Sequence, residues 1–357
     1  MISASTSLRH VAALVAFGLS AACGEAAERA GAEAGPPSAA VAEPVPSADL
    51  HVHIGTQASA DLIGSIQPTS ARDSTTAEDA IAALDEAGIE RGLVLSLGYL
   101  FGGRGTEGLD EEALVRAEND YVVAQVAGYA DRLVAACSVN PLKEYALKEI
   151  QRCFDDLGVR TLKLHFTNSD VDLRLEAHVD RLRQVWSMLA AKGGFAIVHM
   201  RTGAEDYGAR DAREFIDGVL AAEPGVPVHI AHMAGWGGYD DATDSALGEF
   251  VTALDDGRLD RGSIWFGLGA VVFQPEAAGQ DTALARVVRE ANETLVDRIR
   301  ELGTDRVTYA TDWPGWPPVP DASQGISANV RLIRGSLGLE DAELTAVFAN
   351  AGLLGSR

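Results

Sequence analysis

Three potential metal ligands alternate along one short apolar segment near residue 50. In Asp49-Leu50-His51-Val52-His53, the odd-numbered positions are an aspartate and two histidines. Successive side chains of a β-strand point to opposite faces, so these three would share one face. Neutral imidazole is the commonest protein ligand for zinc and related metals. The histidine pair alone is weak evidence, and the rest of the chain must supply the other ligands.

More ligand-type residues end later apolar segments. Lys163 and His165 close Thr-Leu-Lys-Leu-His, and His199 closes Phe-Ala-Ile-Val-His. His232 closes Val-His-Ile-Ala-His, and Asp312 follows Val-Thr-Tyr-Ala-Thr. A single histidine at such a position is more often a packed or loop residue than a ligand. Five apolar strands with ligand-type residues favour a metal site when they are taken together.

Strand periodicity separates neighbouring histidines. His229 and His232 are three residues apart and should therefore face opposite sides of their strand. We expect His232 to enter the site and His229 to be structural. Lys163 and His165 are two residues apart, so both could enter. His178 lies in a helical pattern and is expected at the surface.

After residue 48, short apolar runs alternate with amphipathic helical patterns. The expected strands are 50–54, 91–97, 133–139, 161–165, 195–199, 226–232, 264–268 and 306–311. The expected helices are 76–87, 111–130, 144–157, 176–192, 209–223, 247–256, 284–302, 328–337 and 341–354. Eight strand-then-helix units predict an α/β fold, a (β/α)8 TIM barrel, whose chemistry lies at the carboxyl ends of the strands. A doubly wound sheet is the alternative, but no GxGxxG follows the first strand.

With these motifs in place, the chain resembles the metal-dependent amidohydrolase superfamily. Lys-Leu-His, Ala-His-Met-Ala-Gly, Thr-Asp-Trp-Pro and Ala-Asn-Ala-Gly-Leu-Leu resemble its amidohydrolase-related branch, which includes aminocarboxymuconate-semialdehyde decarboxylase. The resemblance covers about residues 48–357 and implies a barrel of the metallo-dependent hydrolase type. It also implies one divalent metal, Zn²⁺ for preference and Mn²⁺ or another ion as alternatives. The implied ligands are His51, His53, His199 and Asp312.

The resemblance also implies roles in catalysis. A metal-bound water has a pKa lowered towards ~7, and Asp312 could take its proton. His232 could polarise a substrate carbonyl or stabilise an oxyanion. Lys163 leaves two alternatives, because a carbamylated lysine could bridge two ions, whereas an unmodified one could bind a substrate carboxylate. We expect one metal and an unmodified Lys163.

Three functions remain open. The first is hydrolysis of a C–N or C–O bond, in an amide, lactone or ester of a small molecule. The second is non-oxidative decarboxylation of an aromatic or unsaturated carboxylic acid. The third is a catalytically inactive lipoprotein that acts as a binding protein at the cell surface. The retention of all the motif residues disfavours this third function.

The substrate is only loosely defined by the residues beyond the strands. Arg201 could clamp an anionic group or be solvated. Trp236, Tyr239, Trp313 and Trp316 could wall a cyclic substrate or simply anchor loops.

The first 48 residues differ from the rest. An apolar run at 11–19 followed by Ser20-Ala21-Ala22-Cys23 predicts a signal peptide over 1–22, with lipidation of Cys23 or simple cleavage as outcomes. Residues 23–48 are rich in Ala, Glu, Pro and Gly and are expected to form a disordered tether to a single domain at 49–357. We therefore expect an exported protein, periplasmic, extracellular or anchored to a membrane through Cys23.

Charge and the remaining cysteines restrict the partners. The formal net charge of −23 disfavours nucleic acid and anionic lipid surfaces. A small-molecule substrate is expected, and a homo-oligomer is open. Cys137 and Cys153 could form one disulfide or remain two buried thiols.

Overall fold

The computed structural model describes residues 43–70, 72–103, 105–275, 279, 281–315 and 325–355. The expected signal peptide at 1–22, Cys23 and the tether up to residue 42 lie outside these residues. No helix in the described ranges combines the length and apolar character needed to cross a membrane.

Eight parallel strands form one sheet whose neighbours follow the chain order. They are β1 (Ala48–His53), β2 (Arg91–Leu95), β3 (Leu133–Ser138), β4 (Thr161–His165), β5 (Phe195–His199), β6 (Val228–Ile230), β7 (Ile264–Gly267) and β8 (Val307–Thr308). Their side chains are almost entirely buried, as expected for strands covered on both faces.

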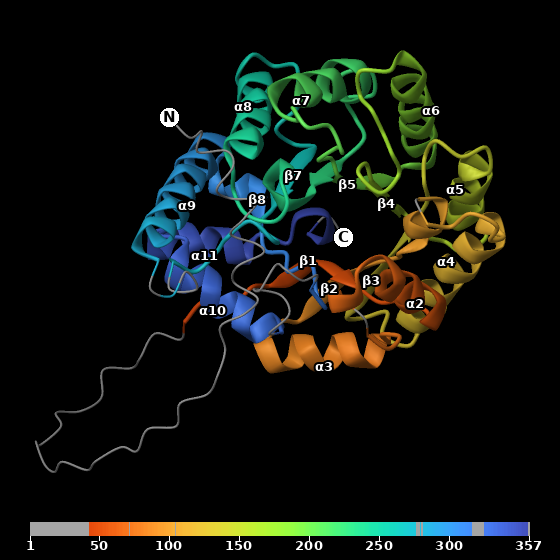
Figure 1. Cartoon of the computed structure of the whole chain (residues 1–357), viewed down its shortest axis with the longest axis horizontal. Coiled ribbons are helices and arrows are strands. Elements are labelled where there is room, and N and C mark those ends of the chain that lie inside the picture. The colour runs from red at the N-terminus through yellow and green to blue at the C-terminus, as the bar shows by residue number, and fades with distance from the viewer. Residues whose placement is uncertain are drawn as a thin grey trace, which may run out of the picture.

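Helices surround this sheet (Figure 1). They are α2 (Gln57–Ile66), α3 (Ala77–Ala87), α4 (Glu111–Ala127), α5 (Ala146–Asp155), α6 (Glu176–Lys192), α7 (Ala209–Phe215), α8 (Asp241–Asp255), α9 (Thr282–Leu302), α10 (Ile326–Ser336) and α11 (Asp341–Ala349). Local sequence sets their ends. For α3, Thr76 and Asp79 form a capping box, and Gly88 ends the helix with a left-handed φ of 71°.

The barrel closes between β1 and the segment that follows β8. The Leu50 amide donates to Tyr309 O at 3.2 Å, and the His53 amide donates to Trp313 O at 2.7 Å. Between them, the Asp312 amide donates to His51 O at 2.9 Å. These bonds hold Asp312 beside the strand that carries the two histidines. The predicted (β/α)8 TIM barrel is confirmed.

Several predicted boundaries were wrong for identifiable reasons. The strand predicted at 226–232 ends at Ile230, because the backbone then enters a short helical turn, η5 (Ala231–Ala234). The strand predicted at 306–311 is regular only at Val307–Thr308, although its continuation still pairs with β1. The helix α2 after β1 was not predicted, although Leu62, Ile63 and Ile66 lie at helical spacing within it.

The end of the barrel opposite the carboxyl ends of the strands is filled by the C-terminal segment. Leu353 and Leu354 of the turn η9 (Gly352–Leu354) pack with Ala48, Leu50 and Leu93. This apolar plug leaves only the other end of the barrel open for a ligand.

A disulfide joins Cys137 of β3 to Cys153 of α5. It ties the third strand to the helix that covers it, and both residues are fully buried. Of the two alternatives left open by the sequence, the structure contains the bridge.

Candidate metal centre

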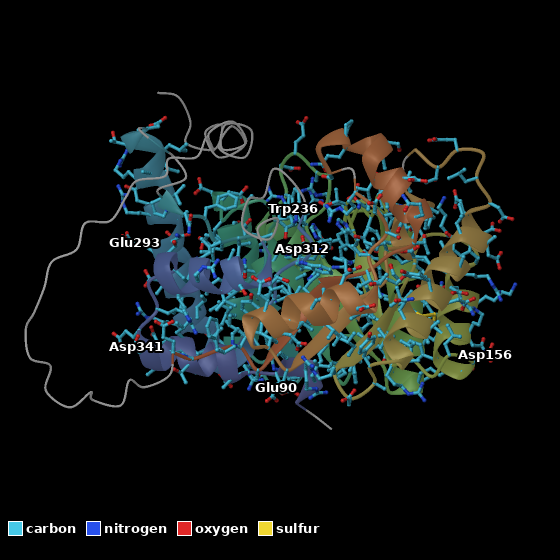
Figure 2. The ribbon with its side chains drawn as sticks, turned by 90° about the horizontal axis from the view of Figure 1, so that it is seen from below. Glu90, Asp156, Trp236, Glu293, Asp312 and Asp341 are labelled. Carbon is cyan, nitrogen blue, oxygen red and sulfur yellow. A yellow bond between two sulfur atoms is a disulfide. The ribbon has the colours of Figure 1, made fainter. Side chains whose placement is uncertain are left out.

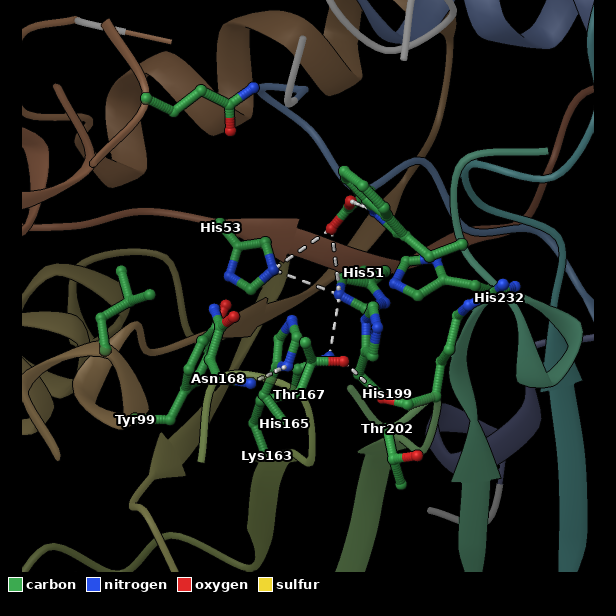
Figure 3. A pocket seen from close by; sticks show the side chains of 15 residues that line it. His51, His53, Tyr99, Lys163, His165, Thr167, Asn168, His199, Thr202 and His232 are labelled. Carbon is green, nitrogen blue, oxygen red and sulfur yellow. Dashed lines mark hydrogen bonds and ion pairs between the residues drawn. The ribbon is translucent and has the colours of Figure 1, made fainter. Parts of the chain in front are cut away.

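A cavity of about 280 Å³ opens at the carboxyl ends of the strands (Figure 3). All six predicted site residues line it. The complete lining is His51, His53, Gln67, Tyr99, Leu100, Lys163, His165, Thr167, Asn168, His199, Arg201, Thr202, His232, Trp236 and Asp312. In the side view of Figure 2, Trp236 and Asp312 lie near the middle of the molecule, whereas Glu90 and Asp341 lie at its edge.

At the base of the cavity, two histidines and an aspartate converge on one point. His51 Nε2 lies 3.1 Å from His53 Nε2 and 3.2 Å from Asp312 Oδ1. His53 Nε2 lies 3.4 Å from the same carboxylate oxygen. Lys163 Nζ approaches His51 Nε2 to 3.2 Å from the opposite wall. All four side chains are buried.

Backbone carbonyl groups fix the tautomers of two histidines. His53 Nδ1 lies 3.1 Å from Leu95 O, and His232 Nδ1 lies 2.9 Å from Gly269 O. A carbonyl can only accept, so each Nδ1 carries a proton and each Nε2 presents a lone pair. This is the arrangement typical of metal-binding histidines, whose second nitrogen donates to an outer partner.

Burial keeps these imidazoles neutral. It lowers the pKa of His51 well below its usual value, with a further contribution from the positive charge of Lys163. Burial likewise lowers the pKa of His232 to about 4. Asp312 differs, because burial raises its pKa but His232, His53 and Lys163 outweigh that effect and hold the pKa below its usual value. Neutral imidazoles and a carboxylate are the protonation states that a metal requires.

The residues present therefore fit a divalent cation. The Nε2 atoms of His51 and His53 lie 3.1 Å apart beside the Asp312 carboxylate, and imidazole nitrogen and carboxylate oxygen are the atom types that bind such a cation. One ligand atom from each of His51, His232 and Asp312 lies within 4.8 Å of the others. His232, predicted to act beside the metal, is thus as close to this cluster as a ligand would be.

His199, the remaining predicted ligand, takes a different position. Its ring stacks on His165 at 3.8 Å between centroids and lies 4.9 Å from the His232 ring. It lines the cavity, and its ring nitrogens make no hydrogen bond or ion pair with His51, His53 or Asp312. Its role as a ligand stays a prediction.

Asp49, which alternates with the two histidines, makes its contacts elsewhere. Its Oδ1 accepts from the amides of His51 at 3.0 Å and Thr311 at 3.1 Å, and its Oδ2 accepts from Thr311 Oγ1 at 2.6 Å. These bonds use both carboxylate oxygens. Asp49 therefore links β1 to the segment after β8, where the barrel closes, and holds these two segments of the cluster together.

The backbone at two site residues is left-handed. His232 has φ 57° and Asp312 has φ 66°, values that non-glycine residues rarely adopt and that concentrate at functional sites. At His232 this turn corrects the alternation argument. His229 bonds Thr308 Oγ1 at 2.8 Å below the cavity, while the turn after Ile230 brings His232 up to the cavity wall.

Lys163 is enclosed completely. Burial lowers its pKa to about 7, and the nearby Asp312 carboxylate opposes that shift only in part. Its amine lies 3.2 Å from His51 Nε2 and lines the base of the cavity, although the side chain as a whole is buried.

Arg201 is engaged by another residue of the chain. Its guanidinium binds both carboxylate oxygens of Asp240, at 2.9 and 3.1 Å, and Thr243 Oγ1 at 3.1 Å. It therefore enters the cavity wall as half of an ion pair, and the interpretation as a solvated loop residue was wrong.

The predicted aromatic wall is only partly present. Trp236 Nε1 donates to Asp312 Oδ2 at 3.4 Å. Tyr239 points away and donates to Asp244 Oδ1 at 2.8 Å. Trp313 is not among the cavity-lining residues, and Trp316 lies outside the described residues. Tyr99, Thr167 and Asn168 were missed, although they follow barrel strands, where such residues can be sought. Gln67 was also missed, because it ends the helix α2, which was not predicted.

The sequence profile of the amidohydrolase family matches residues 48–351. This chain belongs to that family. Comparison with curated protein sequences finds no significant match.

Solved structures with the same fold include enzymes of several kinds. An amidohydrolase from Burkholderia multivorans with bound zinc has TM-score 0.57 and 14% identity over 87% of this chain and 98% of that one. A dihydroxybenzoic acid decarboxylase from Polaromonas with bound manganese has TM-score 0.56 and 15% identity over 85% and 95%. A protein assigned as a 2-pyrone-4,6-dicarboxylic acid hydrolase from Pseudomonas putida has TM-score 0.54 and 16% identity over 85% and 94%. At these identities the likeness establishes the fold.

Proposed function

We propose that this amidohydrolase-family protein is a metal-dependent decarboxylase of a small aromatic or otherwise unsaturated carboxylic acid. The observation that carries the proposal is a cavity of about 280 Å³ with planar side chains on its walls and the His51–His53–Asp312 cluster at its base. Tyr99, His165, His199 and Trp236 supply those planar walls. The volume suits a single ring, since sites for drug-sized ligands start at about 300 Å³.

The cation would be held by His51, His53 and Asp312, with His232 or His199 completing the set. When bound, it would supply charge that draws the substrate carboxylate to the base of the cavity. Zn²⁺ or Mn²⁺ is proposed, since related folds carry one or the other. One ion is favoured together with an unmodified Lys163, whose protonated amine beside His51 would balance the substrate's negative charge.

Asp312 is the residue placed to move the proton. In decarboxylation the bond between the ring carbon and the carboxylate carbon breaks, its electron pair stays on the ring carbon, and that carbon takes a proton as CO₂ leaves. Asp312 belongs to the cluster at the base of the cavity, and Trp236 Nε1 donates to its second oxygen. It can deliver this proton after taking it from solvent.

Hydrolysis of a C–N or C–O bond is the second candidate. The depressed pKa of Asp312 favours it, because an ionised carboxylate can accept a proton from water as a general base. The two reactions use the same residues and differ in their products.

The experiment is a product analysis on a panel of aromatic carboxylic acids, lactones and amides with the metal-loaded protein. Release of CO₂ in step with loss of the carboxylate supports decarboxylation. Turnover without CO₂, accompanied by opening of a lactone or amide, would replace it with hydrolysis. Absence of any turnover with a fully metal-loaded protein would favour a binding function.

We also propose that the chain is exported through residues 1–22 and held at a membrane by lipid on Cys23. The Cys137–Cys153 disulfide supports export, because such bridges persist in oxidising compartments. Mass spectrometry of the mature N-terminus in the producing cell tests this. An unmodified Met1 would overturn both export and lipidation. An N-terminus at Cys23 without attached lipid would leave export standing and overturn only the lipidation.

A further inference from the structure

His165 ends β4 and stands between two other rings at the side of the cavity. Its ring stacks on His199 at 3.8 Å between centroids with an interplanar angle of 13°, and it packs at a tilt against Tyr99 at 4.8 Å with an angle of 34°. The stack holds the plane of the imidazole parallel to the cavity wall. His165 is only partly buried, in contrast to the enclosed His51 and His53.

At His165 the backbone donates the hydrogen bond to the ring, whereas at His53 and His232 the backbone accepts it from the ring. The backbone amide of Asn168 donates to His165 Nδ1 at 3.3 Å. An amide N–H can only donate, so Nδ1 must hold the lone pair and the proton of the neutral ring must sit on Nε2. At His53 and His232 a backbone carbonyl accepts from Nδ1 and leaves Nε2 as the lone-pair atom. The backbone thus places the ring proton on Nε2 in His165 and on Nδ1 in His53 and His232.

The Nε2–H of His165 faces the cavity. Among the described residues this atom has no hydrogen-bond partner, and it is not one of the side-chain polar atoms that are buried away from solvent without a partner. Figure 3 shows the ring with one edge held at Asn168 and the other directed up towards His51 and His53. A neutral N–H donor that is pre-aligned by stacking and open to the cavity suits an oxygen acceptor on a ligand.

We infer that His165 is a substrate-binding residue that donates its Nε2–H to a carboxylate oxygen of the substrate, and that it is not a metal ligand. Two planar neighbours and a fixed tautomer make it specific for a flat acid lying along the stack. The choice of a carboxylate rests on the proposed function. The tautomer and the exclusion from the metal rest on this structure alone.

The first test reads the tautomers directly. Long-range proton–nitrogen NMR of protein labelled with ¹⁵N-histidine distinguishes an Nε2–H ring from an Nδ1–H ring, with His165→Gln assigning the signal. We expect Nε2–H at His165 and Nδ1–H at His53 and His232. On titration with Zn²⁺, the Nε2 signals of His53 and His232 should shift to coordinated values while His165 keeps its proton. An Nδ1–H tautomer at His165, or coordination of its nitrogen, would overturn the inference.

The second test measures dissociation constants for benzoate by calorimetry on the zinc-loaded protein. His165→Phe keeps a stacking ring without the donor, and His165→Gln places an amide N–H near the Nε2 position. We expect benzoate to bind about tenfold more weakly to His165→Phe, with most of the loss restored in His165→Gln and the zinc stoichiometry unchanged in both. Equal benzoate affinity in wild type and His165→Phe overturns the donor role. If benzoate does not bind to the wild-type protein, a substrate carboxylate is not the acceptor of the His165 hydrogen bond. That result would count against the proposed function, whereas the NMR test of the tautomer would be unaffected by it.

Discussion

Asp49 and Thr311 are joined by two hydrogen bonds across the seam where the barrel closes. Thr311 donates its hydroxyl to Asp49 Oδ2 at 2.6 Å and its amide to Asp49 Oδ1 at 3.1 Å. Thr311 immediately precedes Asp312, and Asp49 lies two residues before His51. The pair therefore sets the distance between the carboxylate and the histidines of the candidate metal centre.

Loss of this pair should loosen both the fold and the site. Thr311→Val removes the hydroxyl donor and leaves a buried carboxylate oxygen without it, which should lower the free energy of unfolding by about 1–3 kcal/mol. Zinc affinity should fall as well, because Asp312 loses its fixed position. Urea denaturation and zinc titration measure the two effects. Thr345→Val, on the outer helix α11, is the matched control and should change neither.

The metal centre should depend on His51 more than on any surface histidine. His51→Ala removes a nitrogen that contacts His53, Asp312 and Lys163, so bound metal and activity should be lost while the circular dichroism stays that of a barrel. Asp312→Ala should also abolish activity. Metal content by elemental analysis is the measurement, with His178→Gln on α6 as the control. Stoichiometric metal and full activity in His51→Ala would show that the site is elsewhere.

Arg201 and Asp240 should be energetically coupled. Each side chain is the main charged partner of the other, so removing one alone leaves a partly buried charge uncompensated. In a double-mutant cycle with Arg201→Met and Asp240→Asn, we expect the double variant to be more stable than the sum of the single losses by about 1–3 kcal/mol. Additive losses would mean that the pair contributes nothing and that Arg201 is available to a substrate anion.

Glu118 on α4 should make stability depend on pH. Burial raises its pKa above the ordinary value of 4.5, and hydrogen bonds from Thr56 and Ser59 offset this only in part. The folded chain therefore keeps this proton to a higher pH than the unfolded chain does. Stability conferred by the protonated form is present below 4.5 and is lost as the pH rises through the folded-state pKa.

The comparison uses Glu118→Gln, which cannot ionise. Relative to this variant, the unfolding free energy of the wild type should fall as the pH is raised from about 4.5 to about 8, as measured by urea denaturation. Glu112→Gln, at the start of the same helix, where the side chain is 40% exposed and pairs with Lys148, is the control. A constant difference between wild type and Glu118→Gln across this range would contradict the raised pKa.

Much of the site could be predicted from local pattern. Alternation along a strand is a property of the backbone, so the sequence already placed His51 and His53 on one face. Apolar runs ending in Lys163, His199 and Asp312 indicated barrel strands, because the carboxyl ends of parallel strands meet at one end of a barrel. The family resemblance added the metal, and the family match supports that expectation.

Local pattern did not show where the backbone leaves its regular path. The alternation rule placed His232 in the site and His229 outside it, in agreement with the cavity lining, but a left-handed turn after Ile230 is what directs His232 there. It grouped Asp49 with the histidines, although the donors that engage Asp49 come mainly from Thr311, more than 250 residues away in sequence. Neither departure has a signal within a short window of sequence.

The sequence by itself determined the barrel, the order of its strands and the end of it at which the ligand-type residues gather. Only the tertiary structure decided which nitrogen carries the proton in the imidazoles of His53, His165 and His232. For His53 and His232 that choice depends on a backbone carbonyl from another segment, Leu95 and Gly269 respectively. For His165 it depends on the backbone amide of Asn168, which the turn after β4 brings back to the ring. Residue type and spacing place a histidine at a site, but the backbone group that contacts one ring nitrogen determines which nitrogen carries the proton.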